Sequence, residues 1–313
     1  MKIKKILITG VAGFIGSNYC EYILKKFKKI KIVGIDNLVV GSKKNILEFL
    51  SNRNFIFYKV DINNLKKIVR ISKNCDLVIH LASNADISKA IKNPLIDYIQ
   101  GFKLTLNIIE AMRKNNIPNI IFSSGSGVYK ECYNNELIEN KTDLLPISTY
   151  GANKLSSEAF ICAYSHLFGI KASIFRFANV VGKRQTHGVA YDFKRKLLKN
   201  SKFIKVMGNG TQKKSYIDVD DVIEATILAF KKQSNKFSIY NIANDDQITV
   251  REILKLVVKK LKIDYPKVEW SKLNRGWLGD VPFVKLSNKK IKKLGWKYRF
   301  NSRQAILNSL EVM

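Results

Sequence analysis

The sequence predicts an α/β fold with a doubly wound parallel sheet, followed by a smaller C-terminal domain. Short apolar runs alternate with longer helical segments through the first half of the chain, which is the pattern of βαβ crossovers. The first apolar run leads directly into closely spaced glycines, a common way for a parallel sheet to open a ligand site. From about residue 179 the expected strands become shorter and loops more frequent. We therefore expect a first domain over residues 1–178 and a second over 179–313, with about 212–243 returning to the first.

The elements of the first domain follow from the apolar periodicity. Continuous apolar or β-branched runs predict strands at 6–9, 31–35, 54–60, 76–80, 119–122 and 171–177. Helical spacing of apolar residues predicts helices at about 14–27, 94–115 and 150–168. The long helix at 94–115 carries its apolar residues on one face, at Ile99, Phe102, Leu106, Ile109 and Met112.

The turn after the first strand has the spacing of a dinucleotide-binding loop. Gly10 allows a tight turn, Gly13 allows backbone to approach a pyrophosphate, and Gly16 lets the following helix pack closely on the strand. The phosphate is then expected at the amides of the helix N-terminus. A glycine-rich turn without a ligand is the alternative for the triplet alone. Asp36 closes the second strand about twenty residues later, where an acid accepts hydrogen bonds from the adenosine ribose. Because that acid also repels a 2′-phosphate, a Rossmann-type domain that binds NAD rather than NADP is predicted.

The ends of the later strands extend the predicted cofactor site. Asp61 and Ile62 follow the third strand, where they could contact the adenine ring, and small residues after the fourth strand let backbone lie along a dinucleotide. The complete set of predicted cofactor-binding residues is Gly10, Gly13, Phe14, Ile15, Gly16, Asp36, Asn37, Gly41, Ser42, Asp61, Ile62, Leu81, Ala82, Ser83, Ser123, Tyr150, Lys154 and Phe177.

Composition bounds the functional class. The chain has 313 residues, 46% of them hydrophobic, and a formal net charge of +30. A basic protein often binds nucleic acid or anionic membranes, but here the lysines are spread over nearly every predicted helix, so neither partner is expected. The cysteines at 20, 75, 132 and 162 show no metal-ligand spacing and suit reduced thiols, and no segment approaches the ~20 apolar residues of a membrane span. We expect a cytoplasmic protein without a metal.

Tyr150 and Lys154 lie four residues apart on one predicted helix, so they share a face and are one turn apart. A lysine cation, together with a positive nicotinamide ring, stabilises phenolate and lowers the pKa of a tyrosine from ~10, which makes the phenol a usable general base. Such a pair is common by chance. Its position after a dinucleotide loop, a ribose-binding acid and a serine-rich strand end favours catalysis.

These motifs together resemble the extended short-chain dehydrogenase/reductase superfamily and, within it, the nucleotide-sugar epimerase/dehydratase family, closest in pattern to UDP-glucose 4-epimerase-like proteins. The resemblance runs from residue 6 to about 296. The matching residues are Thr9-Gly-Val-Ala-Gly-Phe-Ile-Gly16, Asp36-Asn37-Leu38, His80-Leu-Ala82, Tyr150 with Lys154, Arg176-Phe-Ala-Asn179, Val181-Gly182, Lys214-Ser-Tyr-Ile217 with Asp221, and Gly279-Asp280-Val-Pro282.

The resemblance implies a nucleotide-sugar site in the second domain. It implies that Phe177 lies near the nicotinamide and that Lys214 stands where the pattern usually has an Arg for the diphosphate. Arg275 is a second phosphate ligand in this scheme, although it lies further from Asp280 than the pattern suggests. The substrate-binding residues implied are Ser124, Asn179, Val189, Met207, Lys214, Arg275 and Asp280.

The fifth strand departs from the family pattern. Proteins of this kind carry a Ser or Thr at the position of Gly125, where its hydroxyl bonds the reacting sugar oxygen. Ser124 and Ser126 are the hydroxyls available here, and Ser126 is predicted as the catalytic one because a glycine on either side leaves its backbone free. The family's 4,6-dehydratases place an Asp-Glu pair directly after the hydroxyl residue, where this chain has Ser126-Gly127. Asp86, in the loop after the fourth strand, is expected to cap that loop.

The sequence therefore predicts an NAD-dependent nucleotide-sugar 4-epimerase, most simply for a UDP-hexose, that acts through a transient 4-keto sugar. A 4-dehydrogenase, reductase or dehydratase of the same family is the enzymatic alternative, and an NAD-binding sensor or scaffold is the non-enzymatic one. His187 is expected to be a loop hydrogen-bonder or a sugar contact. Because the 94–115 and 150–168 helices offer more apolar residues than one sheet face can cover, a homodimer is predicted.

Overall fold

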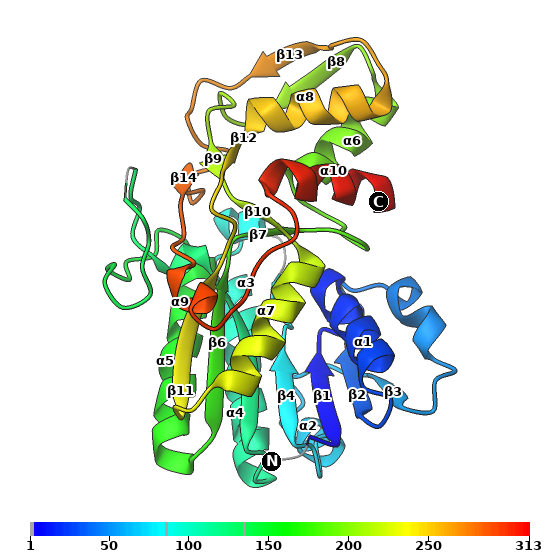
Figure 1. Ribbon diagram of the computed structural model, residues 1–313, viewed down its shortest axis with the longest axis vertical. Helices are drawn as coiled ribbons and strands as arrows, with labels where there is room; N and C mark the ends of the chain where they lie inside the picture. Colours follow the sequence, from blue (N-terminus) through cyan, green and yellow to red (C-terminus); the bar gives the residue numbers. More distant parts are fainter. Residues whose placement is uncertain (1–2, 85–86, 134) are drawn as a thin grey trace.

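The structure, a computed structural model, describes residues 3–84, 87–133 and 135–313. Within these residues, seven parallel strands form the central sheet in the order β11-β6-β5-β4-β1-β2-β3, which confirms the predicted fold class (Figure 1). The strands are β1 (Lys5–Thr9), β2 (Lys31–Asp36), β3 (Phe55–Lys59), β4 (Leu77–His80), β5 (Asn119–Gly125), β6 (Lys171–Phe177) and β11 (Phe237–Ile242). The chain builds β2 and β3 on one side of β1 and then crosses to β4 on the other. Ligands of open parallel sheets bind at such a switch point.

Helices cover both faces of this sheet (Figure 1). One face packs against α2 (Leu65–Ile71), α4 (Lys103–Lys114) and α5 (Thr149–Phe168). The other packs against α1 (Phe14–Lys26) and α7 (Val219–Lys232). The face of α4 that meets the sheet carries Leu104, Ile108 and Met112, which are buried at helical spacing. Of the five residues predicted for this face, Ile109 and Met112 are buried, whereas Phe102 and Leu106 are half-buried and Ile99 is exposed, because the buried stripe is rotated toward Leu104 and Ile108.

Local sequence signals set the ends of α5. The Ser148 hydroxyl accepts a hydrogen bond of 3.1 Å from the amide of Gly151 and so caps the first turn. Gly169 follows the last turn with φ of 71°, a left-handed conformation that glycine adopts without strain. The helix is therefore held in register, and with it the side chains of Tyr150 and Lys154.

The helix predicted over 94–115 is interrupted, which corrects the sequence-based expectation. The structure has α3 (Leu95–Asp97), a π-helical turn η3 (Tyr98–Phe102) and then α4. Gln100 leaves helical geometry with φ of −101° and ψ of 24°. A Cβ at Gly101 would lie 2.3–2.5 Å from the side chain of Asn153, so close packing against α5 occupies the space that a side chain at 101 would need. Apolar periodicity alone does not reveal such a break.

The C-terminal part consists of short strands and amphipathic helices above the carboxyl ends of the sheet (Figure 1). Its strands are β7 (Asn179–Val181) with β10 (Tyr216–Asp218), β8 (Phe203–Val206) with β13 (Lys267–Trp270), and β9 (Lys213–Lys214) with β12 (Ile248–Thr249) and β14 (Phe283–Val284). Its helices are α6 (Val189–Lys199), α8 (Val250–Leu261) and α10 (Ser302–Val312). The short helix α9 (Lys289–Lys292) instead packs against β11 of the large sheet, where Ile291 joins the core. The α6, α8 and α10 helices share one apolar core. In chain order, α7 and β11 come between β10 and β12, but they belong to the large sheet and its core. The predicted boundaries of the two domains stay a prediction.

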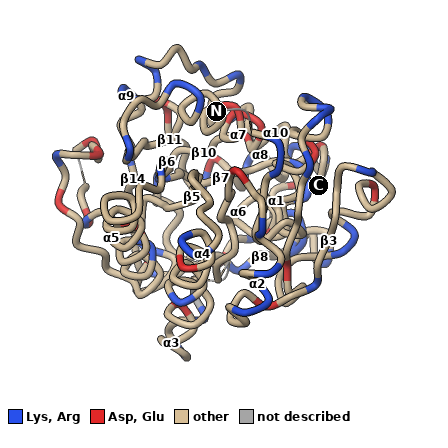
Figure 2. Tube along the Cα trace, turned by 90° about the horizontal axis from the view of Figure 1, so that it is seen from below, with Lys and Arg blue, Asp and Glu red and all other residues tan. Residues whose placement is uncertain are grey.

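Short 3-10 turns complete the described structure: η1 (Lys43–Phe49), η2 (Ile87–Ile91) and η4 (Ser126–Val128). Lysine and arginine are distributed over many elements, as Figure 2 shows from below. Among the described residues, none of the helices combines the length and the apolar character that a bilayer span requires.

Candidate active site

A cavity of about 620 Å³ lies at the carboxyl ends of the sheet strands and is lined by residues of both the large sheet and the C-terminal part. Its walls come from the loops after β1, β2, β4, β5 and β6 on one side and from the Lys214, Trp277 and Asp280 segments on the other. A volume of this size is typical of small-molecule and cofactor sites.

The loop after β1 forms a phosphate cradle. Gly10 has φ of +66°, and a Cβ on Gly16 would lie 2.1 Å from the carbonyl oxygen of Gly10, so neither position admits another residue without a shift of backbone. The α1 helix begins directly after this loop. Its N-cap, Gly13, offers no side-chain cap, and its first turn holds no acid. The amides at this helix end therefore face the cavity without a competing side-chain acceptor, which suits a pyrophosphate.

Asp36 is held at the end of β2 by backbone amides. Its Oδ2 accepts a hydrogen bond of 3.0 Å from Ala12, and its Oδ1 accepts one of 2.8 Å from Leu38. Burial raises the pKa of this carboxyl, against these two hydrogen bonds, which lower it. A Cβ on Gly41 would lie 2.8 Å from Oδ2, so a glycine there leaves the carboxylate room. Because each carboxylate oxygen has two lone pairs, ribose hydroxyls can still bond to it.

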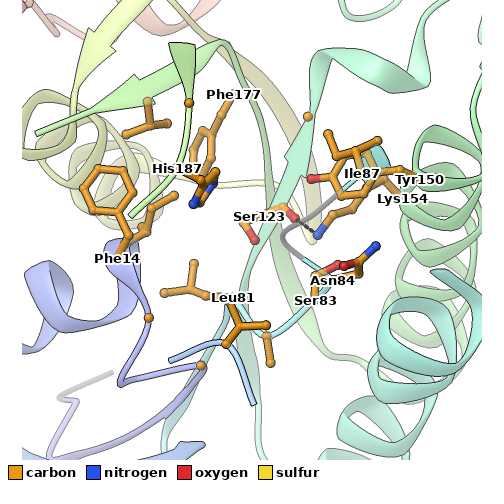
Figure 3. A pocket seen from close by; sticks show the side chains of 18 of the residues that line it. Phe14, Leu81, Ser83, Asn84, Ile87, Ser123, Tyr150, Lys154, Phe177 and His187 are labelled. Carbon is orange, nitrogen blue, oxygen red and sulfur yellow. Dashed lines mark hydrogen bonds between the residues drawn. The ribbon is translucent and has the colours of Figure 1, made fainter. Parts of the chain in front are cut away.

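Lys154 reaches from α5 into the end of β5. Its Nζ donates a hydrogen bond of 2.8 Å to the carbonyl oxygen of Ser123, and it lies 5.7 Å from the ring centroid of Tyr150 (Figure 3). The pair lies on the opposite side of the cavity from Phe14 and His187 (Figure 3). Burial lowers the pKa of Lys154 to about 8, whereas the charges of Glu158 and Asp97 raise it.

The pKa of Tyr150 moves in the direction opposite to the sequence-based expectation. Burial raises it to about 12, and the negative charge of Asp97 acts in the same direction. The protein's own groups therefore keep the phenol protonated, because desolvation penalises phenolate in a pocket wall of low polarity. The fall in pKa predicted from the sequence requires the positive nicotinamide ring in addition to the Lys154 cation.

His80 is a structural link beneath this pair. It is fully buried, its Nδ1 lies 2.7 Å from Thr9 Oγ1, and its Nε2 lies 3.2 Å from Thr105 Oγ1. Burial and the nearby charge of Lys154 lower its pKa to about 3, so the imidazole is neutral. Thr9 Oγ1 also accepts hydrogen bonds from the amides of Leu81 and Ala82, which fixes the cavity wall after β4.

Gly125 faces Tyr150 directly. A Cβ there would lie 3.9 Å from the phenol oxygen, an ordinary contact, and its φ of −154° suits any residue. Both neighbouring serines line the cavity. Ser124 is only 4% exposed, and its hydroxyl has no hydrogen-bond partner within the described chain, whereas Ser126 is partly exposed at the start of η4. Position 125, where the family resemblance predicts a hydroxyl-bearing residue, therefore has room for a side chain, and Ser124 and Ser126 flank it.

The lining of the cavity also holds an ion pair. Lys214 Nζ bonds the carboxylate of Asp280, whose other oxygen accepts a hydrogen bond of 3.0 Å from the amide of Gly276. Asn179 and Val189 line the same region, and Gly188, just before α6, has φ of +105°. Lys214 is half-buried, so a phosphate that binds beside it meets a cation already balanced by an acid.

Most predicted site residues line this cavity, but three lie elsewhere. Met207 is 65% exposed at the end of β8, and Ser42 caps η1 by accepting a hydrogen bond from the amide of Lys44. Arg275 donates a hydrogen bond of 2.9 Å to Glu131 in the loop that precedes α5, so its guanidinium is already paired. The roles assigned to these three stay predictions. Asp86 lies outside the described residues.

Sequence reasoning missed several lining residues. Trp277 forms a wall and packs on Gly279, where a Cβ would lie 2.3 Å from the indole ring. Tyr216, Gln185 and Asn84 also line the cavity. Trp277 carries a usable signal, an aromatic residue between two glycines. The others belong to strands or loops that become cavity walls only through the fold. The described part of the chain brings together no group of three or more His, Cys, Asp or Glu side chains placed to hold a metal ion.

Comparison with known proteins identifies the family of this chain. The model of the NAD dependent epimerase/dehydratase family matches residues 6–243. The chain belongs to this family. It is 31% identical to a putative UDP-glucose 4-epimerase of Methanocaldococcus jannaschii, over 96% of this chain and 95% of that protein. It is 29% identical to a UDP-glucuronate 4-epimerase of Thermodesulfobacterium geofontis, over 86% of this chain and 88% of that protein.

A solved structure extends the likeness to the fold and the cofactor. The UDP-glucose 4-epimerase of Thermus thermophilus, in complex with NAD, superposes with a TM-score of 0.86 at 27% identity, over 98% of each chain. The prediction of NAD as cofactor is thereby confirmed at the level of the family, and the glycine cradle, the uncapped end of α1 and Asp36 fit that group. This family member is thus an NAD-dependent enzyme of the nucleotide-sugar epimerase and dehydratase type.

Proposed function

We propose that this chain is a nucleotide-sugar 4-epimerase acting on a UDP-hexose. The observation that carries the proposal is that one cavity is lined both by the Tyr150–Lys154 pair and by the Lys214–Asp280 ion pair. In this arrangement the Tyr150 phenol is available to the sugar, Lys214 to the diphosphate and Asp280 to the ribose of the nucleotide. When bound, NAD supplies the acceptor and the donor of a hydride at the sugar C4 carbon.

The residues of the chain handle the proton and the orientation. As a phenolate that the Lys154 ammonium stabilises, Tyr150 takes the proton of the C4 hydroxyl. It holds this proton as a neutral phenol while the 4-keto sugar is present, and then returns it to the sugar oxygen. Ser126, or Ser124 in its place, donates a hydrogen bond to the same oxygen. The 4-keto sugar turns over within the cavity, so that the returning hydride meets its other face. The glycines at 125 and 127 leave open space beside Tyr150 for this rotation, since a Cβ at either would meet nothing nearer than 3.7 Å.

The alternatives differ in specific residues. A 4,6-dehydratase needs an acid and a base beside C5 and C6, and Ser126-Gly127 supplies neither at the place where the resemblance puts them. A 4-dehydrogenase or reductase would use the same Tyr150 and Lys154. A sensor or scaffold without activity has no need of a buried ammonium beside a phenol, which costs desolvation free energy. We therefore place the epimerase first.

The experiment uses the purified protein. Denaturation and mass analysis identify the released cofactor, and proton NMR follows UDP-galactose, UDP-glucose, UDP-glucuronate and UDP-N-acetylglucosamine for conversion at C4. Formation of the C4 epimer without net oxidation supports the proposal, with Tyr150→Phe as the control. A stable 4-keto product would favour the dehydrogenase or dehydratase, and no conversion of any sugar in the presence of bound NAD would refute an enzymatic role for these substrates.

We also propose a homodimer built on the helical face near η3 and α5. Apolar side chains stand exposed along this face, at Leu95, Tyr98, Phe160, Leu167 and Phe168. The rings of Phe102 and Phe160 are in contact, with centroids 5.1 Å apart, so part of the surface is already ordered. Several large apolar side chains exposed on neighbouring helical elements favour an interface. The cytoplasmic location stays a prediction.

A further inference from the structure

One buried carboxylate joins the cavity wall to the start of the catalytic helix. Asp97, the last residue of α3, is 1% exposed. Its Oδ1 accepts a hydrogen bond of 2.9 Å from Asn84 Nδ2, and its Oδ2 accepts one of 2.7 Å from Thr149 Oγ1. Asn84 lines the cavity after β4, and Thr149 is the first residue of α5, directly before Tyr150. The carboxylate thus connects two segments that both border the Tyr150 phenol.

The charges around Asp97 explain why an acid there matters. Lys154 is 4% exposed, and the described chain gives it a hydrogen bond to a backbone carbonyl but no ion pair. Glu158, on the same helix, is already bound by Arg176 through two hydrogen bonds of 3.0 and 2.6 Å. His80 on β4 is neutral. Asp97 therefore places a negative charge near the Tyr150–Lys154 pair. The hydrogen bonds that the structure describes for this carboxylate come from neutral donors, Asn84 and Thr149, and not from a cation.

The direction of its effect follows from electrostatics. A negative charge favours the protonated form of both partners, and the charge of Asp97 raises the pKa of Tyr150 and of Lys154 alike. Since the two groups are coupled, the quantity affected is the pH at which the pair releases its first proton. Asp97 moves that pH upward.

We propose that Asp97 is a positioning residue of this site: it fixes Asn84 and the start of α5 around Tyr150, and its charge keeps the Tyr150–Lys154 pair protonated until the positive nicotinamide ring is bound. This rests on the proposed function for the role of Tyr150 as base. Deprotonation is thereby coupled to occupation of the cofactor site, so an enzyme without the oxidised cofactor holds no phenolate.

The test removes the charge and keeps the contacts. In Asp97→Asn, the new amide oxygen can accept from Asn84 while the amide nitrogen donates to the Thr149 hydroxyl. Asp97→Ser removes the same charge with a smaller side chain and serves if the first variant does not fold. Thr149→Val is the matched control, because it removes one hydrogen bond and leaves the carboxylate.

The readout is carbon-13 NMR of tyrosine labelled at Cζ, titrated with saturating NAD⁺ and no substrate. Comparison with Tyr150→Phe assigns the Tyr150 signal. We expect the titration midpoint of Asp97→Asn to fall by about one to three pH units, because one charge at an effective dielectric constant of about 20 changes a pKa by about three units at about 4 Å and about one unit at about 12 Å. Thr149→Val is expected to keep the wild-type midpoint and to lose turnover. Equal midpoints in wild type and both charge-removing variants would overturn the proposal.

A second readout separates this proposal from the proposed function. If the protein converts a nucleotide sugar, the acidic limb of its pH–rate profile is expected to shift to lower pH in Asp97→Asn and not in Thr149→Val. If it converts none, the NMR midpoints still decide the role of Asp97, because they need only the protein and NAD⁺. An unshifted acidic limb in an active Asp97→Asn enzyme would contradict the charge effect.

Discussion

Replacing Ser126 with Ala removes a hydroxyl from the cavity beside Tyr150, and we expect the rate of epimerisation to fall ten- to a hundredfold. One hydrogen bond to a charged oxygen in the transition state contributes about 1.5–3 kcal/mol, and each 1.4 kcal/mol corresponds to about tenfold in rate. Ser124→Ala is expected to change the rate much less. Its hydroxyl is buried without a partner in the described chain, so its removal is also expected to cost little stability.

A hydroxyl introduced at position 125 is expected to restore the activity lost in the Ser126→Ala enzyme. A Cβ there would make only an ordinary contact of 3.9 Å with Tyr150, and the backbone is extended, so Gly125→Ser requires no strain. We expect Gly125→Ser to restore activity to the Ser126→Ala enzyme, because the new hydroxyl faces the phenol directly. Gly125→Ala in the same background is the matched control, since it adds the Cβ without the oxygen.

The assay is the initial rate of interconversion of UDP-galactose and UDP-glucose, followed by proton NMR. Full activity of Ser126→Ala together with a tenfold or greater loss in Ser124→Ala would refute the assignment and identify Ser124 as the donor. Full activity of both variants would exclude both serines, and the proton would then be handled by Tyr150 or a water molecule.

Four further predictions concern the cofactor, the base, the assembly and the core. Asp36→Ser is expected to weaken NAD binding and to relax discrimination against NADP, measured by calorimetry, because the carboxylate no longer accepts from the ribose or repels a 2′-phosphate. Tyr150→Phe is expected to lower turnover by 10²–10⁴-fold while NAD stays bound, measured by rate and by cofactor content. Light scattering is expected to show a dimer of the wild-type protein at micromolar concentration. The Phe160→Asp variant is expected to be a monomer, because it places a charge among the exposed apolar side chains. Glu158→Gln is expected to destabilise the fold by about 3–5 kcal/mol in urea unfolding, because it leaves the 1%-exposed Arg176 guanidinium without its counter-charge.

Each of these has a result that would contradict it. Equal affinity of the unmutated protein for NAD and NADP would sink the role of Asp36, and a Tyr150→Phe enzyme with more than about a tenth of the wild-type rate would exclude its role as general base. A monomeric wild type would remove the case for the dimer. A loss below about 1 kcal/mol in Glu158→Gln would show that the buried pair adds little.

Local pattern in the chain was enough to predict the elements that carry the cofactor loop and the catalytic pair. The glycines at 10, 13 and 16, the acid at 36 and the four-residue spacing of Tyr150 and Lys154 predicted a dinucleotide loop, a ribose contact and a general base with its cation. The structure gathers all of these around one cavity. Apolar runs likewise predicted six of the seven described strands of the large sheet, since a buried parallel strand needs apolar residues on both faces. The seventh strand, β11, was expected only as part of the 212–243 segment that returns to the first domain.

Contacts between distant segments could not be predicted in this way. The fold joins Lys214 to Asp280, 66 positions away, and pairs Arg275 with Glu131, 144 positions away. It also places Asp97 between Asn84 and Thr149 and raises the pKa of Tyr150. The physical reason is the same in each case. Spacing along the chain sets which side chains share a helix face, but burial and the choice of an ion's partner depend on which segments the packed core brings together.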